Sequence, residues 1–446
     1  MSTTVLSLTE SDLRSCVELA LAEAKKLGAS EAEVGVSMDI GLAVTARMRE
    51  VETLEYHRDR GMGVTVYRGK RKGSASTADL SVQAIRESVA KAYSIAGFTA
   101  EDPCAGLPDA DELARDIPDL DLNHPWDIEP EAARELAVTC EGAALAVDPR
   151  INNSEGATLS SHQGLRMFGN SLGFIAGYAS TMHSLSCAVI GQQNGDMQRD
   201  YWYSSTRDYR DLDSAVSIGE RAAKRTLERL GAQRVATCVA PVLFVPELAR
   251  GFIGHFLGAI RGGSQYRRAS FLLDAAGQQV FPSWFSCVER PHLLKALGSA
   301  PFDSEGVATH DRKLVDQGVL TGYVLSTYSA RKLGLKTTGN AGGVHNLIIE
   351  PGQDDYAALL KKMHRGLVVT ELMGQGINGV TGDYSRGAAG FWVENGEAVY
   401  PVHEITIAGN LKDMYQHVVA VGSDVDARGG IRTGSILLES MTIAGT

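Results

Sequence analysis

Ala32-Glu33-Val34-Gly35-Val36, Leu42-Ala43-Val44-Thr45 and Met62-Gly63-Val64-Thr65-Val66-Tyr67 are short segments rich in β-branched residues, and they decide the fold class of the first half of the chain. β-Branched side chains favour extended backbone, so each segment predicts a strand. Helical apolar spacing precedes them over residues 11–28 and follows them over residues 81–96. The predicted order is helix, three strands, helix.

The same order of elements returns further along the chain. We expect a helix over 129–147, strands over 156–161, 163–169 and 173–190, and a helix over about 213–230. The sequence therefore predicts an internal repeat of αβββα type, with units at residues 10–98 and 129–231. The segment 101–128 between them is rich in proline and aspartate, which predicts an extended connector.

A different pattern begins near residue 235. A strand from Val239 to Val245 and a helix over 247–260 open it, and the remainder is rich in glycine and in short strand-like runs. Strands are expected at 366–373, 389–394, 398–409, 416–421 and 434–444, with short helices at 329–333 and 354–364. We predict an α+β fold with an N-terminal domain of mixed helices and strands at residues 1–234 and a mainly β C-terminal domain at residues 235–446.

The composition is typical of a soluble folded protein. Apolar residues make up 44% of the chain and charged residues 22%, and the net charge is −11. The negative balance argues against nucleic acid as a partner, because phosphate binding needs clustered basic residues. Met1 to Glu10 lacks the pattern of a secretory signal, and no apolar run reaches the roughly 20 residues that cross a bilayer. Six scattered cysteines fit reduced thiols, with no disulfide framework.

The most specific segment of the chain runs Gly374-Gln375-Gly376-Ile377-Asn378-Gly379-Val380-Thr381-Gly382-Asp383-Tyr384-Ser385-Arg386-Gly387 and continues through Tyr400 to Lys412. With the blocks Asn194 to Met197 and Pro301 to Val307, it resembles the TldD/PmbA family of zinc proteases, and within it the PmbA (TldE) branch. The resemblance runs nearly end to end. It implies a subunit of a cytoplasmic TldD/TldE heterodimer that degrades unfolded polypeptides and processes peptide precursors such as microcins and antitoxins.

The helix at 247–260 decides which subunit the resemblance implies. A helical zinc site needs two imidazoles and a carboxylate that polarises the bound water. The catalytic branch carries His-Glu-x-x-x-His here, whereas this chain has Arg250, Gly251 and His255, and no cysteine follows Cys287 to act as third ligand. We therefore expect no catalytic residue and no metal in this chain, and zinc in a TldD-like partner.

His255 on its own is expected to be a hydrogen-bonded interface or core residue, because its helical neighbours are apolar or lack side chains. The glycine-rich segment 374–379 matches a dinucleotide fingerprint, but no helix follows, so it predicts backbone packed closely against a strand or a peptide. Asp383, Tyr384, Ser385 and Arg386 are the first candidates, with His255, for contact with substrate or partner.

Two other functions stay open at the level of sequence. One is a binding module that acts alone on another protein, suggested by the family's older label as a modulator of DNA gyrase. The other is a homodimeric peptidase that holds a metal through His255 with distant His345 or His403.

Overall fold

The computed structural model describes residues 8–445, so part of the segment expected to lack a signal sequence, Met1 to Glu10, lies outside the description. The helices are α1 Glu10–Lys26, α2 Val82–Phe98, α3 Pro130–Ala146, α4 Ala215–Glu228, α5 Pro246–Ile260, α6 Gly262–Tyr266, α7 Thr327–Leu333, α8 Tyr356–Met363 and α9 Leu411–Gln416. The strands are β1 Glu31–Arg47, β2 Glu50–Arg68, β3 Arg71–Thr77, β4 Ile151–Asn170, β5 Ile175–Gln193, β6 Asp196–Thr206, β7 Cys238–Phe244, β8 Cys287–Glu289, β9 Arg312–Asp316, β10 Val319–Leu320, β11 Leu347–Ile349, β12 Gly366–Met373, β13 Asp383–Glu394, β14 Glu397–Asn410, β15 Val418–Val421, β16 Ile431–Arg432 and β17 Ile436–Ala444.

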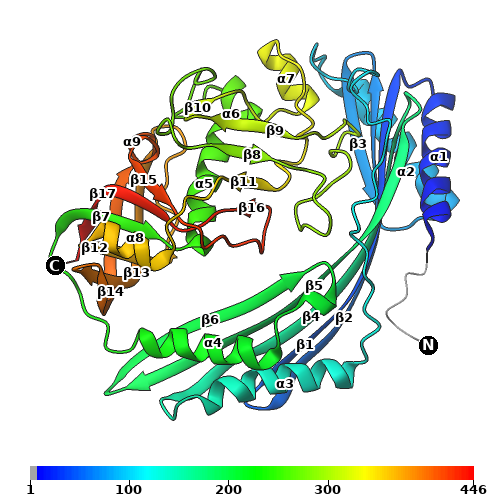
Figure 1. Ribbon diagram of the computed structural model, residues 1–446. Coiled ribbons are helices and arrows are strands. Elements are labelled where there is room, and N and C mark those ends of the chain that lie inside the picture. Colours follow the sequence, from blue (N-terminus) through cyan, green and yellow to red (C-terminus); the bar gives the residue numbers. More distant parts are fainter. Residues whose placement is uncertain (1–7, 446) are drawn as a thin grey trace.

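The first half of the chain builds one long antiparallel sheet. Its strand order is β3-β2-β1-β4-β5-β6, and the two halves of the repeat join where β1 pairs with β4. Figure 1 shows that this sheet curves around the C-terminal half of the molecule, with helices on its outer side. The fold class is therefore α+β, and the αβββα repeat is confirmed.

Two separate helical layers cover the outer face of this sheet. α1 and α2 pack on one end around Val17, Val34 and Ile85, and α3 and α4 pack on the other around Leu159 and Ile218. The second pair lies so close together that a Cβ built on Gly219 would meet the Cys140 carbonyl oxygen at 2.0 Å. Only glycine permits this approach of α4 to α3.

The predicted boundaries of the strands were wrong in both repeat units. The segments expected as two strands within residues 32–45 form the single strand β1, and those within 156–169 form β4, while β3 and β6 were not expected at all. Polar residues such as Ser37 and Gln163 interrupt the apolar pattern, yet they occupy the less buried face of a long strand. Period-two alternation along a half-covered sheet tolerates them.

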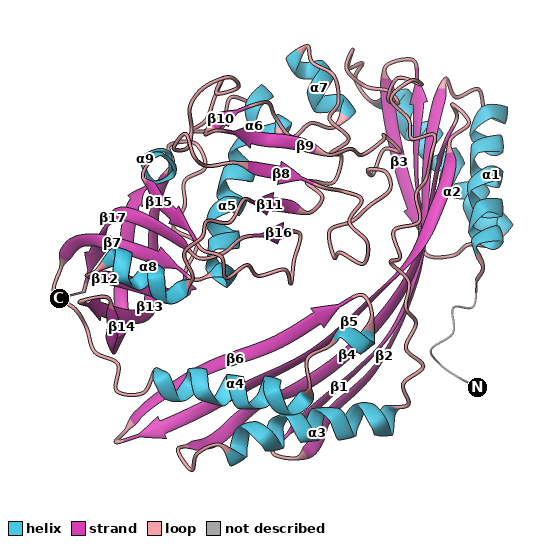
Figure 2. Ribbon diagram, viewed as in Figure 1, coloured by secondary structure: helices cyan, strands magenta, loops and turns pink. Residues whose placement is uncertain are grey.

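The second half of the chain contains two further sheets. One has the order β10-β9-β8-β11-β16, and the other β14-β13-β12-β7-β17-β15. In the second sheet β14 also pairs with β17, which closes part of it into a barrel-like ring. α5 lies against this ring within the main C-terminal core, as Figure 2 shows. We keep residues 1–234 and 235–446 as the proposed division into domains.

Polar bridges join the curved sheet to the C-terminal half. Arg428 donates to the Tyr203 carbonyl oxygen at 2.8 Å, and Arg207 donates to the Leu297 carbonyl oxygen at 2.8 Å. Lys295 pairs with the buried Asp208 at 2.9 Å. Among residues 8–445, no helix has the length and apolar character needed to cross a membrane.

Candidate functional site

α5 is held rigidly in the C-terminal core. Pro246 stands in its first turn, where the missing N–H leaves no helical hydrogen bond unmade. Phe252 and Phe256 are buried, and the Tyr415 hydroxyl donates to the Phe252 carbonyl oxygen at 3.0 Å. This packing therefore sets the directions in which the remaining side chains of α5 point.

Arg250, which stands where the catalytic branch has its first histidine, is engaged with protein atoms. Its guanidinium donates to the Tyr203 hydroxyl at 3.0 Å and to the Arg428 carbonyl oxygen at 3.1 Å, and it lies 3.6 Å from the Asp426 carboxylate. Tyr203 belongs to β6, so this side chain ties α5 to the curved sheet. Gly251 beside it is exposed.

A charged cavity of about 960 Å³ opens beside the first turn of α5. The guanidinium carbons of Arg221 and Arg428 lie 3.6 and 4.0 Å from the ring centroid of Trp202. Glu247 lies 3.6 Å from Arg225 and 3.4 Å from Arg428. Cations and carboxylates thus neutralise one another across the junction of the two halves of the chain, which favours a structural role for these charges.

His255 points to β13, the strand that carries the other sequence-predicted residues. Its ring centroid lies 6.1 Å from that of Tyr384, at an edge-to-face angle of 68°. Burial of the imidazole, together with the positive charge of Arg386, lowers the pKa of His255 below its ordinary value. Burial raises the pKa of the Tyr384 phenol to about 12. The structure therefore brings together His255, Tyr384 and Arg386, with both the imidazole and the phenol neutral near pH 7.

Asp383 and Ser385 do not join this group. Side chains alternate along β13, and Tyr384 is buried while Asp383 and Ser385 are exposed. The Asp383 carboxylate accepts a hydrogen bond from the Thr381 hydroxyl at 2.6 Å. The candidate residues thus divide between a packed face against α5 and an open face.

The glycine-rich segment before β13 approaches that strand very closely. A Cβ built on Gly376 would lie 1.9 Å from the Ser385 carbonyl oxygen, and the Ser385 amide donates to the Gly376 carbonyl oxygen at 2.7 Å. The segment is followed by β13, and no helix begins there. The expected close packing of this backbone against a strand is confirmed, and it leaves no helix N-terminus for a pyrophosphate.

The α5 residues do not fit the zinc ion that the family would imply. Arg250 cannot donate a lone pair and is already bound, and His255 faces Tyr384. His345 lies beside Glu289, and His403 lies on β14. In the described part of the chain, no group of three or more His, Cys, Asp or Glu side chains could hold a metal ion.

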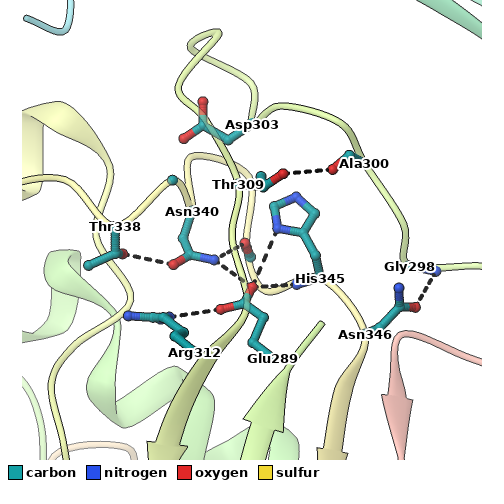
Figure 3. Close-up of polar contacts among 12 residues, drawn as sticks. Glu289, Gly298, Ala300, Asp303, Thr309, Arg312, Thr338, Asn340, His345 and Asn346 are labelled. Atoms are coloured by element: carbon teal, nitrogen blue, oxygen red, sulfur yellow. Dashed lines mark hydrogen bonds and ion pairs between the residues drawn. The ribbon is translucent and has the colours of Figure 1, made fainter. Parts of the chain in front are cut away.

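A buried polar cluster that sequence reasoning missed lies around Glu289, at the end of β8 (Figure 3). Glu289 is 2% exposed. Its carboxylate accepts hydrogen bonds from Arg312 at 2.9 Å, from the Asn340 amide at 2.7 Å and from the backbone N–H of His345 at 2.6 Å. Burial alone would raise the pKa of Glu289, but the hydrogen bonds from His345 and Arg312 outweigh it and lower the pKa. Glu289 therefore remains a buried anion.

Asp303, also drawn in Figure 3, marks the other side of this region. Burial raises the pKa of its carboxyl to about 6, although the backbone amides of Ala341, Glu305 and Val307 donate to it. Asp303 and His345 both line a cleft of about 640 Å³ between the C-terminal half and the curved sheet. Asp303 stands in the block Pro301 to Val307, which is the one sequence signal that could have pointed to this cleft.

Comparison with known proteins identifies the class to which this architecture belongs. Models of PmbA/TldA metallopeptidase domain 1, central domain and C-terminal domain match residues 32–96, 123–230 and 237–445. These three matches assign the chain to the PmbA/TldA metallopeptidase family.

The curated relatives cover almost the whole chain. The metalloprotease PmbA of Escherichia coli O157:H7 is 52% identical over 99% of this chain and 98% of its own length. The PmbA homologue of Haemophilus influenzae is 50% identical over 100% of this chain and 98% of its own. A crystal structure from Bacteroides thetaiotaomicron, described as a proposed modulator of DNA gyrase, superposes with a TM-score of 0.93 at 27% identity over 98% of this chain and 100% of that one. The chain belongs to the TldD/PmbA family, in its PmbA branch.

Proposed function

We propose that this chain is the non-catalytic subunit of a two-subunit zinc metallopeptidase of the cytoplasm. The catalytic zinc would reside in a TldD-like partner. The present chain would complete an enclosed chamber and help to hold an unfolded polypeptide, or a peptide precursor such as a microcin or antitoxin, in extended form. This is the division of work that the family and the residues of α5 support together.

The observation that carries the proposal is the state of α5. The position of the first ligand holds Arg250, which binds Tyr203 and lies near Asp426, and His255 packs against Tyr384. Arg250 thereby ties α5 to the curved sheet, and His255 packs α5 against β13 within the C-terminal half. A zinc ligand must instead keep a lone pair free and pointing toward the metal.

A role in holding peptide is supported by the open face of β13. Asp383 and Ser385 are exposed there, and both belong to a strand fixed by close glycine packing. β14 borders β13 on one side, and β12 with the glycine-rich segment borders it on the other, so its backbone groups are already paired and a peptide would contact the exposed side chains of this face. The proposal therefore expects Asp383 and Ser385 to line the surface along which an unfolded polypeptide lies.

Co-expression with a TldD-like chain tests the assignment. We expect a stable complex that digests unfolded casein in a chelator-sensitive way, and no digestion by the present chain alone. Elemental analysis of the purified single chain should find no stoichiometric zinc. Zinc near one ion per chain that survives mild dialysis and is lost in His255→Ala would contradict the proposal, as would chelator-sensitive digestion by the single chain.

A stand-alone modulator of another protein is the second candidate, favoured by the description of the Bacteroides relative. It predicts that the purified chain, without a TldD-like partner, alters the supercoiling activity of purified gyrase. The net charge of −11 would suit contact with the enzyme better than with its DNA.

A further inference from the structure

The cleft between the C-terminal half and the curved sheet holds two arginines, Arg166 of β4 and Arg207, which directly follows β6. The Arg166 guanidinium lies 5.2 Å from the Tyr178 ring centroid and donates to the Tyr178 hydroxyl at 3.2 Å. Arg207 donates to the carbonyl oxygens of Thr181 at 2.9 Å and of Leu297 at 2.8 Å. In the described part of the chain, neither guanidinium forms an ion pair with a carboxylate. Both positive charges are therefore left without a counter-ion.

The environment of Arg207 is unfavourable for its charge. Its Nε is buried and has no hydrogen-bond partner among the described residues. Burial lowers the pKa of Arg207, and the positive charge of Arg166 lowers it further. An arginine in a protein does not lose its proton, so the repulsion and the unpaired donor both remain. An anion bound between the two guanidinium groups would relieve both.

The acidic groups nearby do not supply that anion. Asp303 is the one acidic residue among those that line the cleft, and it belongs to the wall drawn in Figure 3. Its oxygens already accept hydrogen bonds from the backbone amides of Ala341, Glu305 and Val307. Asp39 on β1 is close enough for the charge of Arg166 to act on its carboxyl, yet these two side chains form no ion pair. The missing counter-ion is therefore expected to come from a ligand.

The rest of the cleft is suited to an apolar group. Phe168 and Phe302 line it, and Phe302 contacts Tyr178 edge to face, with ring centroids 5.7 Å apart. Gly342 and Gly343, with φ of 103° and 129°, line the opposite wall and leave it without side chains. The volume of about 640 Å³ lies within the roughly 300–1,000 Å³ typical of ligand sites. The cleft thus joins a cationic group to an aromatic wall.

We propose that this cleft binds the C-terminal carboxylate of a short peptide between Arg166 and Arg207, with an apolar last side chain against Phe168 and Phe302. A planar carboxylate can accept paired hydrogen bonds from guanidinium N–H groups. The choice of a peptide as the carrier of the carboxylate rests on the proposed function, because hydrolysis of a peptide bond leaves a free carboxylate on one fragment. No residue of α5 or β13 lines the cleft, so this site is separate from the candidate residues on those two elements.

Isothermal titration calorimetry of the purified full-length chain with N-acetylated Ala-Ala-Phe tests the proposal at neutral pH. The free acid should bind saturably. Its C-terminal amide should bind about tenfold more weakly or worse, because it lacks the charge that the two arginines receive. The free acid of Ala-Ala-Gly, likewise acetylated, should also bind about tenfold more weakly, because it has no side chain to bury against the aromatic wall. Inorganic phosphate should bind more weakly than Ala-Ala-Phe for the same reason.

Arg166→Gln tests the site from the side of the protein. Arg166 is exposed, so its loss should leave the fold intact, and binding of the Ala-Ala-Phe acid should weaken about tenfold. Arg60→Gln is the matched control, because Arg60 is an exposed arginine of β2 in the same sheet and does not line the cleft. It should bind the peptide like the wild type. Thermal unfolding checks that both variants fold, and the comparison of acid with amide needs no variant.

Each result can also contradict the proposal. It is overturned if the wild type does not bind the free acid, if the amide binds equally well, or if Arg166→Gln binds like the wild type. Phosphate that binds as tightly as the peptide overturns the assignment of a peptide ligand. These titrations use the chain without a TldD-like partner and cleave no bond. Their failure is therefore distinguishable from a failure of the co-expressed complex to digest casein.

Discussion

Replacement of Glu289 by glutamine tests whether the buried cluster at the end of β8 stabilises the C-terminal half. The side chain of Glu289 is 3% exposed and that of Arg312 is 15% exposed, with 2.9 Å between the Arg312 Nε and the carboxylate. Glutamine keeps one acceptor oxygen, which can still receive the bonds from Asn340 and from the His345 backbone. It places an NH₂ group against Arg312, so this guanidinium loses its counter-ion inside the protein.

The expected loss follows from burial. Removing one partner of a buried ion pair costs about 3–5 kcal/mol, because the remaining charge is uncompensated. The same change in an exposed pair costs about 0–1 kcal/mol. Glu155→Gln supplies that comparison, since Glu155 pairs with Arg199 at 2.8 Å with both side chains nearly half exposed.

Urea unfolding followed by tryptophan fluorescence measures both variants. We expect Glu289→Gln to lower the transition midpoint strongly and Glu155→Gln to leave it nearly unchanged. The double variant Glu289→Met with Arg312→Met should recover part of the loss, because no unpaired charge then remains. The reasoning is refuted if Glu289→Gln unfolds within about 1 kcal/mol of the wild type, the range typical of an exposed pair.

Three further changes have defined outcomes. The pKa of Asp303 is raised from 3.8 to about 6, so its contribution to stability is fully present below about pH 4, and about 3 kcal/mol of the free energy of unfolding is lost as the pH rises through 6. Urea unfolding at a series of pH values should show this loss in the wild type and not in Asp303→Asn. Parallel pH profiles of the two proteins would contradict the prediction. Gly376→Ala should destabilise by about 1–3 kcal/mol in thermal unfolding, because its Cβ meets a β13 carbonyl oxygen at 1.9 Å, whereas Gly379→Ala, with nothing within 4 Å, should be nearly neutral. The double variant Arg250→His with Gly251→Glu restores the helical motif, yet we expect it to stay inactive on casein. No third protein ligand is present, and a five-residue spacing on a helix turns the two imidazoles about 140° apart. Robust chelator-sensitive digestion by this variant alone would reveal a hidden ligand.

Most helices and the longer strands could be located from the sequence, but the lengths of the strands and the sheet β10-β9-β8-β11-β16 could not. Apolar alternation marked β1 near Val34 and again near Val44, and the polar residues between them looked like a break. In the structure these residues lie on the less buried face of one long strand. β6 was missed for a related reason, since Asp196 to Thr206 is rich in polar and aromatic side chains that gain their burial only beside β5 and α4.

The candidate site shows the same division. The residue types alone indicated that Arg250 and Gly251 cannot be metal ligands, because a guanidinium has no lone pair to donate and glycine has no side chain, whatever the fold. The spacing on α5 also indicated that His255 lies apart from them. The strand was expected only from residue 389, so the sequence analysis did not anticipate that Asp383 and Ser385 would face away from Tyr384 and Arg386.

The sequence by itself determined the family, the αβββα repeat and the loss of the helical ligand pair, since these follow from local pattern and residue type. The tertiary structure decided which distant groups meet: His255 with Tyr384, Arg250 with Tyr203, and Glu289 with Arg312. It also brought Arg166 and Arg207 to one cleft. Such contacts depend on how the sheets curve and pack against one another. A short stretch of sequence contains no information on which distant residues will contact it.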